Sequence, residues 1–171
     1  MIDLKTLCRD VPGFPREGII FKDITPLLRE GGRFKEVIDR ISQRYLDKEI
    51  DVVVSIEARG FIIGPAIAYR LGAGVVPVRK KGKLPWHCYQ ATYDLEYGTD
   101  TLEIHRDAIK SGERVLIIDD LLATGGTAKA VINLIERLKG QIVEIAFLIE
   151  LTLLKGREQI GDYPVFSLIK C

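Results

Sequence analysis

The stretch VLIIDDLLATGGT, residues 115–127, places two adjacent aspartates beside a loop of small and hydroxyl residues. Asp119 and Asp120 follow four large apolar residues, so we expect them at the carboxyl end of a buried strand. Carboxylates at such a position can accept hydrogen bonds from a vicinal diol, such as that of ribose, or face a divalent cation. The pair therefore predicts a polar ligand at this edge of the sheet.

The loop that follows has the features of a phosphate cradle. It leads into a predicted helix, whose free N–H groups and positive dipole end favour an anion. Gly125 and Gly126 let the backbone approach that anion, and Thr124 and Thr127 supply hydroxyl donors. A ribose 5-phosphate would satisfy the loop and the two carboxylates at once.

A purely structural interpretation of the same residues is that the aspartates end a strand and the loop is a helix N-cap with turn glycines. The loop is not a nucleoside-triphosphate loop, because no lysine follows its glycines, and it lacks the GxGxxG spacing of dinucleotide sites. We favour a functional role because each part of the segment fits one ligand.

Composition limits the remaining function classes. The 171 residues fit one domain, and 47% hydrophobic with 29% charged residues is typical of a globular protein. The net charge of +1 argues against a general nucleic-acid or membrane-surface binder. A bound anion must therefore be met by local cations.

The N-terminus and the cysteines predict a cytoplasmic protein. The first ten residues include Asp3 and Lys5 and lack the apolar run of a signal peptide. Nowhere does the chain approach the ~18 consecutive apolar residues of a membrane span. Cys8, Cys88 and Cys171 are far apart and form no CxxC pair, which fits a reducing compartment and neither a disulfide framework nor a zinc site.

Short apolar runs alternate with helical patterns along the chain. We expect strands at 51–56, 74–78, 114–119, 142–150 and 165–169, and helices at 34–45, 61–72 and 127–139. Strands separated by helices indicate a doubly wound, mostly parallel α/β sheet with helices on both faces. Ligands of such folds lie beyond the carboxyl ends of the strands.

Two regions depart from this alternation. Residues 1–32, rich in proline and glycine, are predicted to form a small N-terminal hood rather than a core element. Residues 79–100 form a long polar segment, which we interpret as a flexible loop that closes over the site. His105 is expected on a strand facing solvent, and no role is assigned to Trp86, His87, Cys88 and Tyr89.

The sequence resembles the type I phosphoribosyltransferases, whose signature is an apolar strand, DD or ED, and then xxATGGT. The segments PGFPREGIIFKDITPLL (12–28), EARGF (57–61), VRKKGKLP (78–85), YDLEYG (93–98) and ELTLLKGRE (150–158) resemble, in the same order, members that act on adenine. Nearly the whole chain is covered, as a single domain over residues 1–171.

This resemblance implies transfer of the 5-phosphoribosyl group from phosphoribosyl pyrophosphate to adenine, giving AMP and pyrophosphate in purine salvage. It implies Mg²⁺ held through the sugar substrate without a direct protein ligand, a homodimer, and no nucleic-acid or membrane partner. A carboxylate beside the purine would manage the proton that leaves the base, and a closed site would exclude water.

The resemblance also assigns residues to each ligand group. The phosphate and ribose would be bound by Asp119, Asp120, Ala123, Thr124, Gly125, Gly126 and Thr127. Pyrophosphate would be bound by Glu57, Ala58, Arg59, Arg79, Lys80 and Lys83, with a non-proline cis peptide in the first turn. Adenine would be bound by Ile19, Ile20, Phe21, Lys22 and Leu151. Glu96 would be the catalytic acid or base, with Tyr97 beside it on the lid.

Two other functions remain open from the residues alone. One is transfer to hypoxanthine, guanine or xanthine, whose keto group would call for a donor such as lysine beside the base. The other is a regulator that senses phosphoribosyl pyrophosphate and binds nucleic acid.

Overall fold

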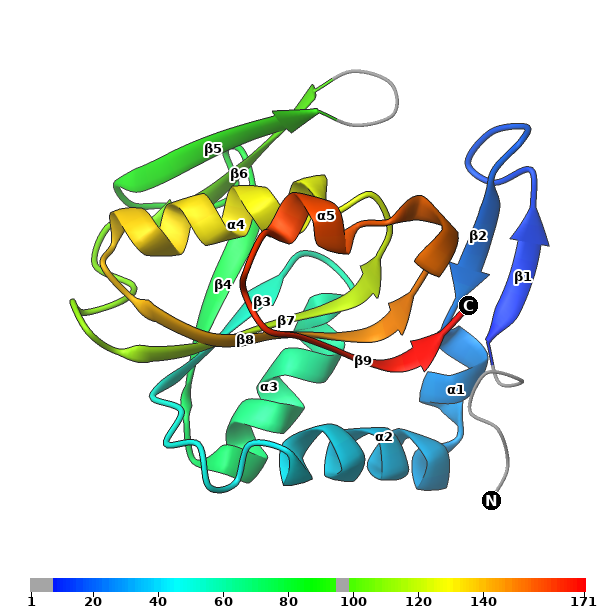
Figure 1. Cartoon of the computed structure of the whole chain (residues 1–171), viewed down its shortest axis with the longest axis horizontal. Coiled ribbons are helices and arrows are strands. Elements are labelled where there is room, and N and C mark those ends of the chain that lie inside the picture. The colour runs from blue at the N-terminus through cyan, green and yellow to red at the C-terminus, as the bar shows by residue number, and fades with distance from the viewer. Residues whose placement is uncertain (1–7, 95–98) are drawn as a thin grey trace.

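A seven-stranded sheet in the order β5-β6-β4-β3-β7-β8-β9 runs through the centre of the molecule (Figure 1). The computed structural model describes residues 8–94 and 99–171. Strands β3 (Val52–Ile56), β4 (Gly74–Lys80), β7 (Arg114–Leu122), β8 (Gln141–Glu150) and β9 (Val165–Lys170) pair in parallel. Strands β5 (Cys88–Asp94) and β6 (Thr99–His105) add an antiparallel pair at one edge.

Helices cover both faces of this sheet, which confirms the predicted doubly wound α/β fold. Side chains alternate along β7, so Leu116 and Ile118 pack in one core with helices α2 (Gly31–Gln43) and α3 (Gly60–Leu71). Val115 and Ile117 pack in the other core with helix α4 (Gly126–Arg137). Burial on both faces explains the continuous apolar character of the strand.

Strand β7 is longer than predicted. It continues to Leu122, so Asp119 and Asp120 lie within the strand rather than at its last residue. The cause is pairing with β8, which matches Leu121 with Ile149 and Leu122 with Glu150. The loop before α4 is correspondingly short.

Residues 8–32 form a ribbon that leads into the core. Strands β1 (Arg9–Pro12) and β2 (Ile20–Asp23) pair antiparallel, on the side to which the arrowheads of β7, β8 and β9 point (Figure 1). The expectation that this region holds no core element is wrong for its last part. Ile24 and Leu27, before and within α1 (Thr25–Arg29), are fully buried against the α2 and α3 core.

In the segment expected as a loop at 79–100, the residues that the structure describes are mainly strand. β4 continues to Lys80, and β5 and β6 form a hairpin that lies along α4 (Figure 1). Tyr89, Ala91 and Tyr93 pack against the core while the residues between them are polar. This period of two was a strand signal that the polar composition obscured.

His105 also departs from expectation, because its Nε2 atom is buried and has no hydrogen-bond partner. Within the described ranges 8–94 and 99–171, no helix has the length and apolar character needed to cross a membrane.

Candidate active site

The loop between β7 and α4 forms a small cavity of about 60 Å³. A single water needs roughly 10–15 Å³, so the cavity has room for a group the size of a phosphate. Gly125 is the N-cap of α4 and has the left-handed φ of 89° that favours glycine. Asp119 also lines the cavity. The other lining residues include all five that were predicted to bind the phosphate: Ala123, Thr124, Gly125, Gly126 and Thr127.

A second glycine fixes the position of this loop. A Cβ atom on Gly125 would overlap the carbonyl oxygen of Gly156, and one on Gly156 would overlap the carbonyl oxygen of Ala123. Gly156 precedes the short helix α5 (Arg157–Ile160). The two backbones therefore touch only because neither residue carries a side chain.

We expect Gly125→Ala to lower the affinity for ribose 5-phosphate at least about tenfold. The positive φ of this position should also destabilise the fold by about 1–3 kcal/mol. The overlap of the new Cβ with the Gly156 carbonyl oxygen adds to both effects. Gly112→Ala is the matched control, because Gly112 has a φ of 87° and nothing within 4 Å of an added Cβ. Calorimetric titration and thermal unfolding measure the two variants. Equal losses of stability and retained affinity in both would contradict a packing role for Gly125.

The two aspartates are buried, with 9% of Asp119 and 6% of Asp120 exposed. The backbone N–H of Asp120 donates to Asp119 Oδ1 at 2.9 Å. Arg59 Nη2 lies 2.8 Å from Asp120 Oδ2. That approach lacks hydrogen-bond geometry, so Oδ2 is an ion-pair partner that still has a free lone pair.

Burial raises the pKa of both carboxyl groups. For Asp119 the neighbouring charge of Asp120 adds to desolvation and raises its pKa well above the usual value. For Asp120 desolvation is opposed mainly by Arg59, and its pKa is still raised. Keeping this pair ionised at neutral pH therefore costs folding free energy, which cationic or hydroxyl ligands would offset.

The sign of this effect gives a pH-dependent prediction. A carboxyl whose folded pKa is raised binds more protons when folded, so its contribution to stability declines as pH rises from about 4 towards the raised value. Asp119→Asn removes this decline and keeps an oxygen for the Asp120 N–H. We expect the variant to have the higher Tm at pH 7 and to lose that advantage near pH 4. Parallel Tm curves of variant and wild type between pH 4 and 8 would contradict the assignment.

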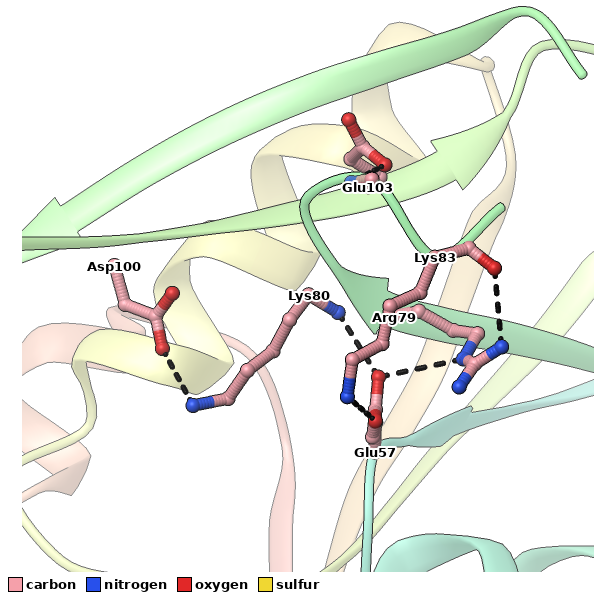
Figure 2. A network of polar contacts seen from close by, with 7 residues as sticks. Glu57, Arg79, Lys80, Lys83, Asp100 and Glu103 are labelled. Atoms are coloured by element: carbon pink, nitrogen blue, oxygen red, sulfur yellow. Dashed lines mark hydrogen bonds and ion pairs between the residues drawn. The ribbon is translucent and has the colours of Figure 1, made fainter. Parts of the chain in front are cut away.

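A cluster of cations surrounds Glu57, at the end of β3, where the Glu57–Ala58 peptide bond is cis as expected. Its carboxylate accepts from Arg79 Nε at 3.3 Å, from the Lys80 backbone N–H at 3.1 Å and from Lys83 Nζ (Figure 2). Burial opposes ionisation, but these donors outweigh it and hold the pKa of Glu57 below its usual value. Four of the six predicted pyrophosphate residues therefore meet at one point.

Arg59, assigned to pyrophosphate by the resemblance, contacts residues of the predicted base and ribose sites. Its Nη1 donates to the carbonyl oxygen of Lys22 at 2.9 Å, and its guanidinium lies 4.6 Å from the centre of the Phe21 ring. With Asp120 on its other side, Arg59 joins the predicted base-binding strand to the predicted ribose carboxylates.

The predicted adenine residues lie on two separate elements. Ile20, Phe21 and Lys22 are on β2, and the Phe21 ring meets Phe14 edge-on at 5.1 Å. Leu151 follows β8 and precedes the 3₁₀ turn Thr152–Leu154, where its N–H donates to the Leu122 carbonyl oxygen at 2.9 Å. Leu151 therefore adjoins the end of β7. Glu96 and Tyr97 lie outside the described residues.

Two acidic residues that the sequence did not single out contact the basic turn after β4. Asp100 Oδ2 lies 2.9 Å from Lys80 Nζ, and Glu103 accepts from the Gly82 N–H at 2.8 Å (Figure 2). Both are on β6, and β6 pairs with β4 at Arg79 and Lys80. No local pattern marks them, because the contact depends on strand pairing.

Comparison with known proteins gives one family. Residues 25–170 match the phosphoribosyl transferase domain. An adenine phosphoribosyltransferase of Trichlorobacter lovleyi is 59% identical over 170 residues, 99% of each chain. One of Chloroflexus aurantiacus is 60% identical over 168 residues, 98% of this chain and 97% of that one.

Solved structures of similar proteins give the same family. The adenine phosphoribosyltransferase of Thermoanaerobacter pseudethanolicus has a TM-score of 0.95 at 49% identity and covers 98% of both chains. That of Saccharomyces cerevisiae, complexed with D-2,5-dideoxy-2,5-imino-altritol 1,6-bisphosphate and adenine, has a TM-score of 0.90 at 45% identity over 96% of both chains. The fold, the loop after β7 and these matches agree, and the chain belongs to the phosphoribosyltransferase family.

Proposed function

We propose that this protein transfers the 5-phosphoribosyl group from phosphoribosyl pyrophosphate to adenine, giving AMP and pyrophosphate. The observation that carries the proposal is one constellation of buried carboxylates and a phosphate-sized cavity. Asp119 lines the loop cavity, and the Arg59 guanidinium joins its buried neighbour Asp120 to the strand of Phe21. Relatives 59% and 60% identical carry the name adenine phosphoribosyltransferase, which supports adenine as the acceptor.

The site residues follow the substrate from one end to the other. The loop of residues 123–127 would bind the 5′-phosphate through backbone N–H groups at the start of α4. Asp119 and Asp120 would accept hydrogen bonds from the ribose hydroxyls. Phe21 would stack on the purine, with Leu151 on the other element of the base site.

The cations around Glu57 would act on the leaving group. As the bond from the anomeric carbon to pyrophosphate breaks, negative charge moves onto the departing oxygen, and fixed cations stabilise it most. The side chains of Arg79 and Lys83 and the backbone N–H of Lys80 already converge on Glu57. Pyrophosphate would compete with that carboxylate for the same donors.

Magnesium fits this site as a partner of the sugar substrate. Within residues 8–94 and 99–171, no three His, Cys, Asp or Glu side chains are grouped to hold a metal. Mg²⁺ usually keeps several waters and binds substrate phosphates. It would therefore be held through phosphoribosyl pyrophosphate, while Asp119 and Asp120 accept from the ribose hydroxyls. When bound, it would neutralise charge on the pyrophosphate. The residues would orient the diol beside it.

The segment after β8 supports adenine over a keto purine. Sites for hypoxanthine or guanine would be expected to offer a lysine donor, and Lys155 is the lysine of the segment after β8. Its Nζ lies 4.0 Å from Glu158, and its side chain is 73% exposed. It is therefore a surface residue, whereas main-chain groups of Ile20–Lys22 would recognise the amino group.

We also propose a homodimer in the cytoplasm. Ile62 and Tyr69, two turns apart on α3, and Val75 on β4 are exposed apolar side chains on adjoining elements. They fit an interface with a second copy, and sedimentation would compare the mass with the 19.2 kDa monomer. The three cysteines are free thiols, which suits a reducing compartment.

One assay tests the proposed reaction. The protein is mixed with phosphoribosyl pyrophosphate, Mg²⁺ and each purine in turn, and the nucleotide formed is identified by chromatography. AMP as the main product is expected. Formation of IMP, GMP or XMP instead would mean that the acceptor is a keto purine. Retardation of nucleic acid without any nucleotide product would favour a regulator.

A further inference from the structure

Lys80 differs from the other cations of the predicted pyrophosphate site because its side chain is held by a separate carboxylate. Its backbone N–H donates to Glu57 Oε2 at 3.1 Å, but its Nζ lies 2.9 Å from Asp100 Oδ2 (Figure 2). Figure 2 shows the side chain extending away from Glu57 towards the Asp100 carboxylate. The backbone of Lys80 thus lies at the predicted pyrophosphate site, while its ammonium group is directed to Asp100.

The Lys80–Asp100 contact is an ion pair whose lysine end is exposed to solvent. Burial opposes ionisation of Asp100, but Lys80 and the Thr101 N–H, 2.8 Å from Oδ1, hold its pKa below the usual value. The side chains of Lys80 and Asp100 are 55% and 22% exposed. Solvent-exposed pairs of this kind are weak, so a more highly charged anion can replace the carboxylate.

Glu103, on the same strand, has a contrasting environment. It is 5% exposed and accepts from the Gly82 N–H and from Gln90 Nε2, both at 2.8 Å. These neutral donors belong to the turn and to β5, so Glu103 anchors the turn whatever the Lys80 side chain does. The turn therefore has one buried anchor and one exchangeable contact.

We propose that Asp100 is a positioning residue that holds Lys80 in a resting orientation, and that Lys80 exchanges Asp100 for pyrophosphate when phosphoribosyl pyrophosphate binds. The inference rests on the proposed function, which gives Lys80 a pyrophosphate partner. Asp100 follows Glu96 by four residues in the chain. When the pyrophosphate site is occupied, Asp100 at the start of β6 therefore loses its lysine partner.

Calorimetric titration with magnesium pyrophosphate tests this exchange in a double-mutant cycle. Asp100→Asn keeps an oxygen for the Thr101 N–H and removes the competing charge. We expect it to bind pyrophosphate about two- to fivefold more tightly, the range that an exposed ion pair covers. In a Lys80→Met background the same change should have no effect, because Lys80 is the group that Asp100 restrains. The KM for phosphoribosyl pyrophosphate should fall by the same factor in Asp100→Asn.

Two further variants make the outcome specific. Asp107→Asn removes an exposed carboxylate just after β6 and should leave pyrophosphate affinity unchanged. Asp100→Glu keeps the charge and should bind as wild type does. An equal gain in both Lys80 backgrounds, or no gain in either, would overturn the exchange, since long-range repulsion or no interaction would then explain Asp100. If the wild-type protein binds neither pyrophosphate nor phosphoribosyl pyrophosphate, the proposed function itself fails; binding without coupling overturns this inference alone.

Discussion

Glu96→Gln is expected to lower the turnover number by about 10²–10⁴-fold, with little change in the affinity for phosphoribosyl pyrophosphate. A proton must leave the purine as the new carbon–nitrogen bond forms. A glutamate hydrogen-bonded to a ring nitrogen can take that proton, whereas an amide of the same size cannot. Steady-state rates of AMP formation measure the turnover, and titration with the sugar substrate measures the binding.

Glu113→Gln is a matched control for this change. Glu113 precedes β7, at the end of the sheet opposite the carboxyl edge, and accepts from the Lys110 N–H at 2.8 Å. Glutamine keeps that acceptor oxygen, so the control should retain full turnover. Unaltered turnover in Glu96→Gln would remove Glu96 from the mechanism. A loss confined to KM would make it a binding residue.

Asp119→Asn combined with Asp120→Asn is expected to weaken binding of phosphoribosyl pyrophosphate by about 10²-fold. A hydrogen bond to a charged acceptor exceeds one to a neutral acceptor by about 1–1.5 kcal/mol, and each aspartate is assigned one ribose hydroxyl. Inorganic phosphate has no hydroxyls of this kind and is repelled by both carboxylates. Its affinity should therefore rise in the same variant, and calorimetry with the two ligands should give opposite signs.

The control for the double variant removes two charges elsewhere. Asp107 and Asp162 are exposed aspartates, so their joint replacement by asparagine changes the net charge equally. It should leave both affinities unchanged. Weaker binding of phosphate together with the sugar phosphate would show general damage to the loop and would count against the diol assignment.

These aspartates illustrate a conflict between stability and ligand binding. Desolvation raises the pKa of each, so ionisation at neutral pH destabilises the folded protein. The same charges are what a ribose diol or a substrate-bound cation would offset. We therefore expect the Asp119→Asn variant to gain stability and lose binding, two effects that a purely structural strand end would not couple.

The sequence by itself determined the parts of this protein that are contiguous in the chain. The apolar run of β7, the aspartate pair and the glycine loop lie within thirteen consecutive residues, so strand, carboxylates and helix start follow from local periodicity and backbone freedom. The parallel strands and their helices were predictable for the same reason. Local patterns fix which element forms and which of its residues face inward.

Only the tertiary structure decided which distant charges meet. Asp120 pairs with Arg59, Glu57 accepts from residues at the end of β4, and Asp100 pairs with Lys80. The hairpin of β5 and β6, read from the sequence as a loop, brings Asp100 and Glu103 to that turn through its pairing with β4. An ion pair acts over a few ångströms, and residues twenty or more positions apart reach that distance only when strand register and packing place them there.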